Sequence, residues 1–415
     1  MRIEVINTGT ELLLGQTLNT HVHWLGGELL KLGLFIQRQV CVPDGPEIRR
    51  VLVEAFSRSD VVLVTGGLGP TSDDVTREIT AELLALPLEE SAAALTAITT
   101  YLARRHREMN AHSRRQAMVP RGARALVNAC GTAPGLYFPP LANAVQGIAM
   151  TPHLFLLPGP PRELHPMFNA EVAPRLAKWH RQPVPKLKNF ALCGVGEAEV
   201  SAAVEPSLRQ AGLAEFGYCV RPGEVIVRCV GDEQALEQCG EIIRTAFPVQ
   251  FFSDGHEPME VVVVRLLGER NEMVATAESC TGGLLAHRLT NVPGASAVFA
   301  TGFVTYANSA KENMLGVPTA LLRSRGAVSK EVAQAMAEGA LARSGAPHAL
   351  AVTGIAGPTG GSVKKPVGTV FVALASATRS TIAVHERFPF EREVFKSLAT
   401  QTALDVLRRR LLGFL

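Results

Sequence analysis

The chain has 415 residues, which is enough for two to four ordinary domains. Hydrophobic residues make up 47% and charged residues 19% of it, so large cores can form and wholesale disorder is excluded. A formal net charge of +3 gives no reason to expect binding to nucleic acid or to a membrane surface. The sequence also lacks a signal-peptide pattern, a membrane-spanning run and a Cys-x-x-Cys pair, so we expect a cytoplasmic protein.

The first region, residues 1–169, alternates strands with helices. Predicted strands cover Ile3–Asn7, Ile36–Val42, Val61–Thr65 and His153–Leu157, and predicted helices cover Thr20–Leu32 and Pro46–Ser57. The strand at 61–65 is apolar almost throughout, which is typical of a parallel sheet covered on both faces. The alternation therefore predicts βαβ units in an α/β layered fold.

The second region, residues 170–255, is smaller and built differently. Its predicted strands are Phe190–Cys193, Tyr218–Val220, Val225–Val230 and Val249–Phe252, and its predicted helices are Glu197–Gln210 and Glu233–Thr245. The sequence Arg221-Pro222-Gly223-Glu224 is a hairpin turn signal between the middle two strands. This β-α-β-β-α-β order predicts a small α+β domain.

The third region, residues 256–415, is again α/β. Predicted strands cover Met273–Ala277, Val298–Tyr306, Ala349–Thr353, Val370–Ala375 and Ile382–Phe388. Predicted helices cover Met259–Leu267, the segment after residue 283 to about Thr290, Ser329–Ser344 and Glu391–Leu412, although the valines of the first would also suit a strand. Ligand sites in such folds lie where strands end and glycine turns begin.

One glycine turn of the first region is followed by two carboxylates. The sequence Thr65-Gly66-Gly67-Leu68-Gly69-Pro70-Thr71 precedes Asp73 and Asp74. Glycines let backbone N–H groups approach an anion, and adjacent carboxylates can share a divalent cation with a phosphate. The alternative is an ordinary turn in which Asp73 or Asp74 caps the next helix.

Two further loops of the first region combine glycine with proline. They are Gly131-Thr132-Ala133-Pro134-Gly135 and Leu157-Pro158-Gly159-Pro160-Pro161. Proline fixes such a turn, and glycine allows a ligand to come close to the backbone. Each loop can equally be purely structural.

Ser279 of the third region is predicted to lie at an elbow between a strand and a helix. There its hydroxyl would be exposed, and the N–H groups of Thr281, Gly282 and Gly283 could form an oxyanion hole. Lys311, 32 residues further on, can act as the base that a serine nucleophile needs if its pKa is lowered. Thr353, at the end of a later strand, could relay a proton or orient the pair. The alternative is that Ser279 only caps the following helix.

These motifs together resemble the CinA family (competence/damage-inducible protein A), and the resemblance covers nearly the whole chain. The first region resembles the MoaB/MogA-like, molybdopterin-binding fold, a three-layer domain, and the second a KH-like connecting domain. The third resembles a nicotinamide-nucleotide amidase domain. The motifs that carry the third resemblance are Ala277-Glu278-Ser279-Cys280-Thr281-Gly282-Gly283, Gly302-Phe303-Val304-Thr305-Tyr306, Gly326-Ala327-Val328-Ser329, Thr353-Gly354-Ile355-Ala356-Gly357-Pro358 and Pro366-Val367-Gly368-Thr369-Val370.

For the third region the resemblance implies deamidation of nicotinamide mononucleotide (NMN) to nicotinic acid mononucleotide and ammonia, without a cofactor. Ser279 would be the nucleophile, Lys311 the base and Thr353 a supporting hydroxyl. The implied substrate-binding residues are Thr281, Gly282, Gly283, Tyr306, Asn308, Gly354, Gly357 and Arg392. The assignment of Arg392 departs from the family pattern, because Phe390-Glu391-Arg392 replaces the usual Gly-Asp-Arg.

For the first region the resemblance implies hydrolysis of ADP-ribose to AMP and ribose 5-phosphate with a divalent metal such as Mg, Mn or Co. The metal would bind at Asp73 and Asp74. The implied nucleotide-binding residues are Glu11, Gly66, Gly67, Gly69, Thr71, Thr132, Pro134, Gly135, Pro158, Gly159 and Pro160. The resemblance further implies a homodimer with small nucleotides as its partners and no membrane.

Two other functions remain open at this point. The first region could bind or adenylylate a molybdopterin cofactor, because fold resemblance alone does not establish function. The protein could also be a non-enzymatic module in DNA uptake or repair. The loop Gly194-Val195-Gly196-Glu197 of the second region argues against DNA, because it has an acidic residue where a phosphate clamp needs a basic one.

Overall fold

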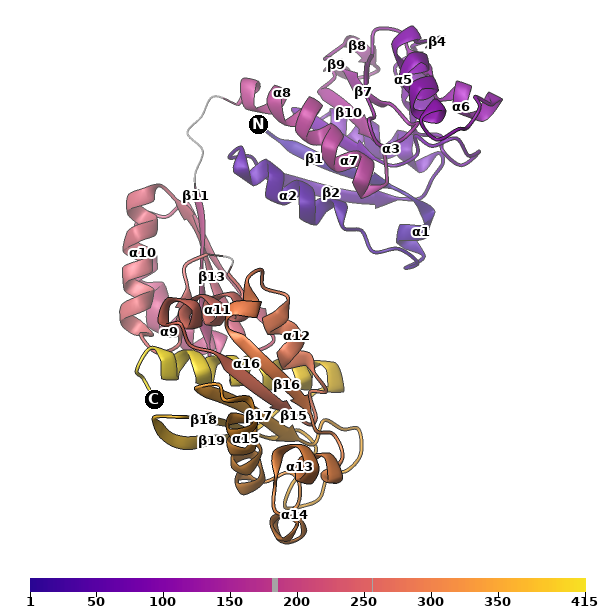
Figure 1. Ribbon diagram of the computed structural model, residues 1–415. Helices are drawn as coiled ribbons and strands as arrows, with labels where there is room; N and C mark the ends of the chain where they lie inside the picture. Colours follow the sequence, from indigo (N-terminus) through magenta and orange to yellow (C-terminus); the bar gives the residue numbers. More distant parts are fainter. Residues whose placement is uncertain (181–185, 256) are drawn as a thin grey trace. The chain divides into compact units, whose positions relative to one another are not determined.

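The computed structural model describes residues 1–180, 186–255 and 257–415 of the chain. It divides into two compact units, Met1–Pro185 and Lys186–Leu415, each of which is described by itself (Figure 1). The boundary predicted at residue 256 lies outside the described residues. None of the described helices is long and apolar enough to cross a membrane.

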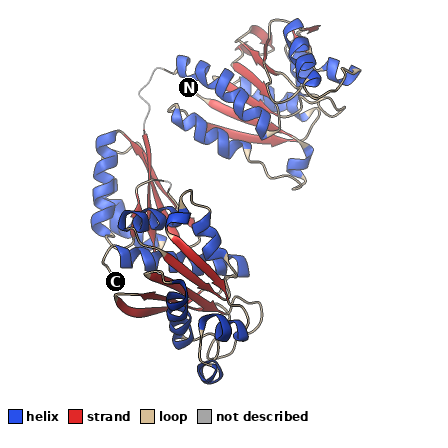
Figure 2. Ribbon diagram, in the orientation of Figure 1, coloured by secondary structure: helices blue, strands red, loops and turns tan. Residues whose placement is uncertain are grey.

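A six-stranded sheet runs through the first unit in the order β2-β1-β3-β10-β7-β6 (Figure 2). The four predicted strands are confirmed as β1 (Ile3–Thr8), β2 (Ile36–Val42), β3 (Val61–Thr65) and β10 (His153–Leu157). All four are parallel, whereas β7 (Gly135–Phe138) and β6 (Arg124–Leu126) extend the sheet in antiparallel fashion. The carboxyl ends of β1, β3 and β10 therefore meet at one edge.

Helices cover both faces of this sheet, so the expected three-layer α/β fold is confirmed. Alternate strand side chains point to opposite faces, which gives two separate cores. The helices of one face are α2 (His21–Lys31), α7 (Pro161–Met167) and α8 (Ala173–Trp179), and those of the other are α3 (Glu47–Phe56), α4 (Thr76–Leu83) and α5 (Ala92–Ala103).

The boundary predicted at residue 169 falls inside a continuous helical segment. A π-helical turn, Phe168–Val172, joins α7 to α8 there. Phe168, Val172 and Leu176 are all fully buried in the core of the first unit. The first unit consequently extends past residue 169, because the apolar residues on both sides of that position pack against the same sheet.

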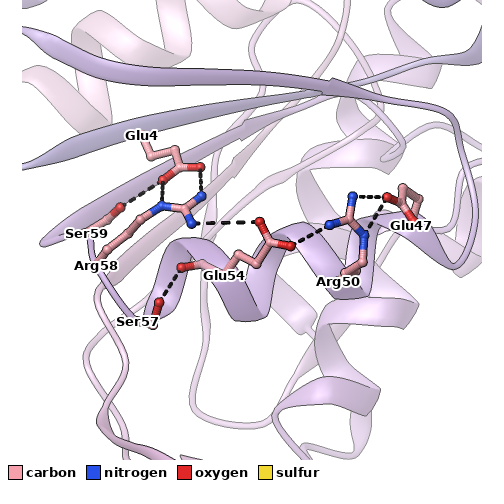
Figure 3. Close-up of polar contacts among 7 residues, drawn as sticks. All are labelled: Glu4, Glu47, Arg50, Glu54, Ser57, Arg58 and Ser59. Atoms are coloured by element: carbon pink, nitrogen blue, oxygen red, sulfur yellow. Dashed lines mark hydrogen bonds and ion pairs between the residues drawn. The ribbon is translucent and has the colours of Figure 1, made fainter.

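A buried carboxylate on β1 is neutralised by an arginine that follows α3 (Figure 3). Glu4 is 2% exposed and accepts two hydrogen bonds, of 2.9 and 2.8 Å, from the guanidinium of Arg58. Ser59 donates a third, and Glu54 continues the network to Arg50 on the surface of α3. This pairing explains how a strand with an inward-facing Glu4 remains in the sheet.

The remaining elements of the first unit are short and were not predicted. They are α1 (Thr10–Leu13), α6 (Ala111–Arg115) and the two-stranded pairs β4 (Leu88–Glu90) with β5 (Met118–Pro120) and β8 (Ala142–Val145) with β9 (Ile148–Met150). Elements of three to five residues carry too little periodicity to be recognised in a sequence.

The second unit begins with the predicted β-α-β-β-α-β arrangement, which is confirmed. Its elements are β11 (Lys186–Cys193), α9 (Glu197–Leu208), β12 (Glu215–Arg221), β13 (Glu224–Gly231), α10 (Glu233–Ala246) and β14 (Phe251–Ser253). The strands form an antiparallel sheet in the order β12-β13-β11-β14, and both helices pack on its apolar face.

A five-stranded sheet in the order β16-β15-β17-β18-β19 forms the rest of the second unit. The strands are β15 (Val274–Glu278), β16 (Phe299–Val304), β17 (His348–Gly354), β18 (Thr369–Ser376) and β19 (Arg379–Arg387). Strands β15, β16 and β17 are parallel, and β18 and β19 are antiparallel to their neighbours. The helices are α11 (Met259–Arg270), α12 (Leu284–Thr290), α13 (Asn308–Leu315), α14 (Thr319–Arg325), α15 (Lys330–Ser344) and α16 (Arg392–Leu411). The valine-rich segment, which could have been a helix or a strand, is therefore a helix, α11.

The two faces of the five-stranded sheet differ in side-chain size. One face carries Ala275, Ala277, Ala349, Ala351, Ala373 and Ala375 and packs against α15. The other carries larger residues and packs against α11 and α16, and its core also takes in Cys193, Ile226 and Phe252 of the preceding antiparallel sheet. The two sheets of the second unit therefore share one hydrophobic core.

Candidate active sites

Three loops of the second unit meet at the carboxyl ends of its parallel strands. Glu278, the last residue of β15, lies in register with Val304 of β16 and Val352 of β17. The next residues along the three strands are Ser279, Thr305 and Thr353. Main-chain hydrogen bonds from Ser279 N–H to the carbonyl of Val352 (2.9 Å) and from Thr305 N–H to the carbonyl of Glu278 (2.8 Å) hold the loops together.

The predicted contact between Ser279 and Lys311 is confirmed. Lys311, on α13, is 1% exposed, and its Nζ donates to Ser279 Oγ at 3.0 Å. The same Nζ donates to the carbonyls of Thr305 (2.7 Å) and Tyr306 (3.2 Å). A neutral amine has two N–H groups and one lone pair. If the two carbonyls take the N–H groups, the lone pair is left facing the hydroxyl of Ser279.

Burial lowers the pKa of Lys311 from the usual value for lysine, because the charged form loses its hydration. The same burial raises the pKa of the neighbouring Cys280 thiol to about 12, so this thiol stays protonated at neutral pH. Of the two adjacent candidate nucleophiles, only Ser279 has a base beside it. Deprotonation at this site is therefore directed to the hydroxyl.

Helix α12 is capped by Glu278 and not by Ser279. The buried carboxylate of Glu278 accepts from the N–H groups of Gly283 (3.0 Å), Leu285 (3.0 Å) and Ala286 (2.8 Å). The alternative interpretation of Ser279 as a helix cap is thus wrong, because a different side chain satisfies the first turn. Sequence reasoning gave Glu278 no role, because it ends β15 and lies five residues before the N-cap position of α12.

These contacts leave fewer free N–H groups to act as the predicted oxyanion donors. The N–H of Gly283 binds Glu278, and the N–H of Gly282 donates to the carbonyl of Ser279 at 3.2 Å. Within the described ranges the N–H of Thr281 has no partner. Thr281 and Thr305 are fully buried, and their hydroxyls also lack a hydrogen-bond partner among the described residues. These unpaired groups can take up charge that develops on a substrate next to Ser279.

Thr353 is fully buried but hydrogen-bonds away from the dyad. Its hydroxyl donates to the carbonyl of Ala327 at 2.9 Å. This bond ties the end of β17 to the loop before α15. The geometry suits a supporting role for Thr353 better than a proton relay.

The structure joins three of the predicted substrate-binding residues, Tyr306, Gly357 and Arg392, by hydrogen bonds. Arg392, the first residue of α16, donates to the carbonyl of Gly357 (3.1 Å) and to the hydroxyl of Tyr306 (3.0 Å). Tyr306 is 62% exposed, so its ring is open to a ligand. Asn308 is exposed at the start of α13. Gly354 packs closely against the neighbouring strand, since a Cβ there would lie 2.8 Å from the carbonyl oxygen of Thr369.

Helix α13, which carries Lys311, is positioned by a glycine of α15. A Cβ on Gly339 would lie 2.0 Å from the carbonyl oxygen of Leu315, the last residue of α13. Only glycine permits so close an approach. The predicted elements did not include α13, so this contact could not be foreseen.

A pocket of about 550 Å³ lies at the carboxyl edge of the parallel strands of the first unit. It is formed by the loops after β1, β3 and β10. Gly66 and Gly67 have φ of 102° and 67°, and a Cβ on either would strike Thr8 or Thr76. The backbone can turn this tightly beside a ligand only because these residues are glycines.

Most of the residues predicted for this site line the pocket, and three do not. Those that do are Glu11, Gly66, Gly67, Gly69, Asp73, Asp74, Thr132, Pro158, Gly159 and Pro160. Gly135 is buried at the start of β7, where a Cβ would lie 2.3 Å from the sulfur of Met167. Pro134 lines a smaller cavity against α5, and Thr71 forms a turn with Asp74. His21, Asp44 and Glu163 also line the pocket but were missed, because only the tertiary fold brings them there.

The pocket is rich in carboxylates. Its lining includes five, on Glu11, Asp44, Asp73, Asp74 and Glu163, and among the described lining residues there is no lysine or arginine. The side chain of Asp74 accepts from the N–H of Thr71 at 2.9 Å, and α4 has no side-chain cap, so the alternative of a capping aspartate is wrong.

These residues fit a hard divalent cation of the kind that keeps its own waters. Magnesium is commonly held by one or two carboxylates together with substrate phosphate. The described residues contain no group of three or more metal-ligating side chains, so an all-protein cage is not formed here. The oxygens of a bound phosphate would complete the metal coordination that such a cage would otherwise provide.

Comparison with known proteins covers both sites. Residues 256–411 match the family described as CinA C-terminal domain, and residues 4–178 match the probable molybdopterin binding domain. A CinA-like protein of Akkermansia muciniphila is 45% identical over 404 residues, which are 97% of this chain and 96% of that protein. The chain belongs to the CinA family.

A second full-length relative and a shorter solved structure are also similar to the chain. A putative competence-damage inducible protein of Symbiobacterium thermophilum is 43% identical over 437 residues, with 100% of both chains covered. The solved structure of a competence/damage inducible protein from Agrobacterium tumefaciens is 45% identical and covers 36% of this chain and 94% of its own, with a TM-score of 0.35. The pair Ser279–Lys311 lies within the CinA C-terminal match, and the acidic pocket lies within the molybdopterin-binding match.

Proposed function

We propose that the C-terminal domain is a nicotinamide-nucleotide amidase that converts NMN to nicotinic acid mononucleotide and ammonia. The observation that carries this proposal is the 3.0 Å contact between a fully buried Lys311 and Ser279 Oγ. Two main-chain carbonyls hold the amine in place, and burial favours its neutral form. A neutral lysine next to a serine is a base poised to activate a nucleophile.

The reaction follows from these groups in two halves. Ser279 Oγ attacks the carboxamide carbon while its proton passes to Lys311 Nζ, and the N–H of Thr281 stabilises the oxyanion. Lys311 then returns the proton to the departing nitrogen, which leaves as ammonia. Water attacks the resulting ester with Lys311 again as the base, and this step releases the acid and regenerates Ser279.

The side chains around Ser279 suit a substrate that carries a negative phosphate and a positive ring. The Arg392 guanidinium, which is exposed beside Tyr306, can bind the phosphate of the mononucleotide. The pyridinium ring of NMN is cationic, and a second cation close to Lys311 disfavours protonation of the amine. Substrate binding therefore helps to keep the base neutral.

Ammonia release from NMN tests this proposal. Ser279→Ala and Lys311→Met are expected to reduce kcat by about 10²–10⁴-fold, because each removes a group that acts in the transition state. Ser309→Ala and Lys330→Met are matched controls at exposed positions and are expected to keep wild-type rates. Absence of ammonia release by the wild type, or equal rates in Ser279→Ala, would remove the proposal.

We also propose that the N-terminal domain hydrolyses ADP-ribose to AMP and ribose 5-phosphate with a divalent metal. The supporting observation is the pocket of five carboxylates whose described lining lacks lysine and arginine. A diphosphate cannot enter such a pocket without a cation to offset the repulsion. Asp73 and Asp74 would hold the ion, which supplies charge neutralisation and orientation of the attacking water. Backbone N–H groups of the glycine loops would bind the remaining phosphate oxygens.

AMP release from ADP-ribose, with and without added Mg²⁺, Mn²⁺ or Co²⁺, tests the second activity. Asp74→Asn is expected to lower it, and Glu89→Gln, a surface change on β4, is a control with the same loss of charge. A molybdopterin-binding function remains the alternative, because a pterin phosphate makes similar demands on the pocket. Tight pterin binding without turnover of ADP-ribose would favour that alternative.

A further inference from the structure

A hydrogen-bonded chain of four side chains runs from the exposed Gln39 through the buried Asn7 and Thr65 to the half-buried His21, which lines the acidic pocket. Gln39 of β2 donates to Asn7 Oδ1 (3.1 Å), and Asn7 Nδ2 donates to Thr65 Oγ1 (2.8 Å). Thr65 Oγ1 lies 3.0 Å from Nδ1 of His21, the first residue of α2. Asn7 and Thr65 are almost completely buried, so the bond between them is shielded from water, whereas the bonds to Gln39 and His21 at the two ends are part-buried.

The donors and acceptors around the ring favour one neutral tautomer of the histidine. Thr65 Oγ1 already accepts from Asn7, so its own proton is free to be donated to His21 Nδ1. An imidazole that accepts at Nδ1 carries its proton on Nε2 and is neutral. The backbone of Gly159 also interacts with the ring and favours an N–H donor there. His21 therefore links the end of β3 to the glycine loop after β10.

We propose that neutral His21 is a positioning residue that holds the loops after β3 and β10 in the geometry that accepts the N-terminal ligand. The inference deepens the proposed ADP-ribose activity and rests on it for its kinetic readout. Protonation would break the arrangement, because a histidine with two N–H groups cannot accept from Thr65. The hydroxyl proton of Thr65 would then be left without its acceptor in a buried place.

Several titratable groups surround His21. His165 of α7 is the nearest histidine, and its positive form would repel a positive His21. Burial lowers the pKa of His165, and Glu28 of α2 offsets only part of this effect. The carboxylates across the pocket belong to Glu11, Asp44, Asp73, Asp74 and Glu163. Burial is the largest influence on His21 and lowers its pKa from 6.5, so the neutral form dominates at neutral pH.

Selective isotope labelling of histidine in the full-length protein tests the arrangement directly by NMR. His21→Gln assigns the signal, and His23→Asn, an exposed histidine of the same helix, is the control. We expect the Nε2–H tautomer at pH 7 and a titration midpoint below 6.5. Thr65→Val is expected to move this midpoint upward, because the neutral ring loses its donor. The Nδ1–H tautomer, a midpoint at or above 6.5, or no response to Thr65→Val would overturn the inference.

The pH profile of ADP-ribose hydrolysis provides the functional readout. In the wild type and in His23→Asn, we expect activity to fall on the acid side at the midpoint that NMR reports for His21. In His21→Gln this acid limb is expected to disappear, with activity at pH 7.5 reduced about fivefold by the loss of one hydrogen bond. An unchanged acid limb in His21→Gln would overturn the positioning role. If the wild type does not hydrolyse ADP-ribose, the proposed function fails and the NMR result alone decides the inference.

Discussion

The contact between Gly339 and the end of α13 predicts that an alanine far from the Ser279–Lys311 pair will disable the proposed amidase activity. Gly339→Ala places a methyl group 2.0 Å from the carbonyl oxygen of Leu315 and 2.9 Å from its carbonyl carbon. Ordinary contacts between such atoms begin at about 3.5 Å, so the end of α13 must withdraw by about 1.5 Å. Lys311 lies one turn earlier on the same short helix and must move with it.

The cost of this displacement can be estimated from the geometry. A misplacement of about 1 Å in a catalytic group costs about 100-fold in rate. We therefore expect kcat for ammonia release to fall by about 100-fold, with a loss of about 1–3 kcal/mol in the free energy of unfolding from overpacking. Steady-state ammonia release from NMN and urea denaturation measure the two quantities.

Gly268→Ala of α11 is the matched control for this experiment. A Cβ at Gly268 would meet nothing nearer than Val298 Cγ1 at 4.0 Å, so the substitution has room in the same unit. We expect wild-type activity and a slight gain in stability from the better helix propensity of alanine. Wild-type activity in Gly339→Ala would refute the argument, as would an equal loss in both variants.

Three more results are expected from the same structure. Lys311→Met should raise the melting temperature at pH 7 while it lowers ammonia release as described above. Burial lowers the folded-state pKa of Lys311, so wild-type stability is highest above pH 10.5 and falls as the pH drops from 10.5 through the folded pKa. The advantage of the variant should therefore vanish near pH 11 in calorimetry. Glu278→Gln should lose about 1–3 kcal/mol in urea denaturation because three N–H groups lose a charged acceptor, and unchanged stability would contradict the capping role. Treatment with EDTA should stop AMP release from ADP-ribose and leave ammonia release from NMN unchanged, so equal inhibition of both would argue against a metal confined to the N-terminal domain.

The sequence predicts the parallel strands of both main sheets and the glycine turns that follow them, because both depend on local patterns, but it does not predict the short strands β4 to β9. The apolar run Val61–Thr65 and the glycine turn after it can be recognised from the amino-acid sequence alone. The residues allow a contact between Ser279 and Lys311 only if the intervening helix and strand return the chain to the same edge of the sheet, and the resemblance to the CinA family favours that contact. The 3.0 Å hydrogen bond between Lys311 Nζ and Ser279 Oγ shows that the chain between them does return to that edge.

Other parts of the two sites depend on contacts that no pattern records. Helix α13 was not predicted, because its eight residues have little apolar periodicity and are held by Gly339. His21 and Glu163 reach the pocket from helices whose own sequences give no sign of it. Gly135 looked like a ligand-binding glycine, but its missing Cβ makes room for Met167. In each case the deciding partner lies far away in the chain.

The shared core of the second unit has a consequence for work with fragments. The side chain of Arg408 on α16 is completely buried and donates to Asp405 and to the carbonyl of Phe251, and Gln401 donates to Glu224 of β13. A truncation at residue 256, where the CinA C-terminal match begins, would remove Phe251 and Glu224 and would expose the apolar surface that packs against Phe252 and Ile226. Such a fragment would be prone to aggregate, and expression trials of the amidase should begin at Lys186.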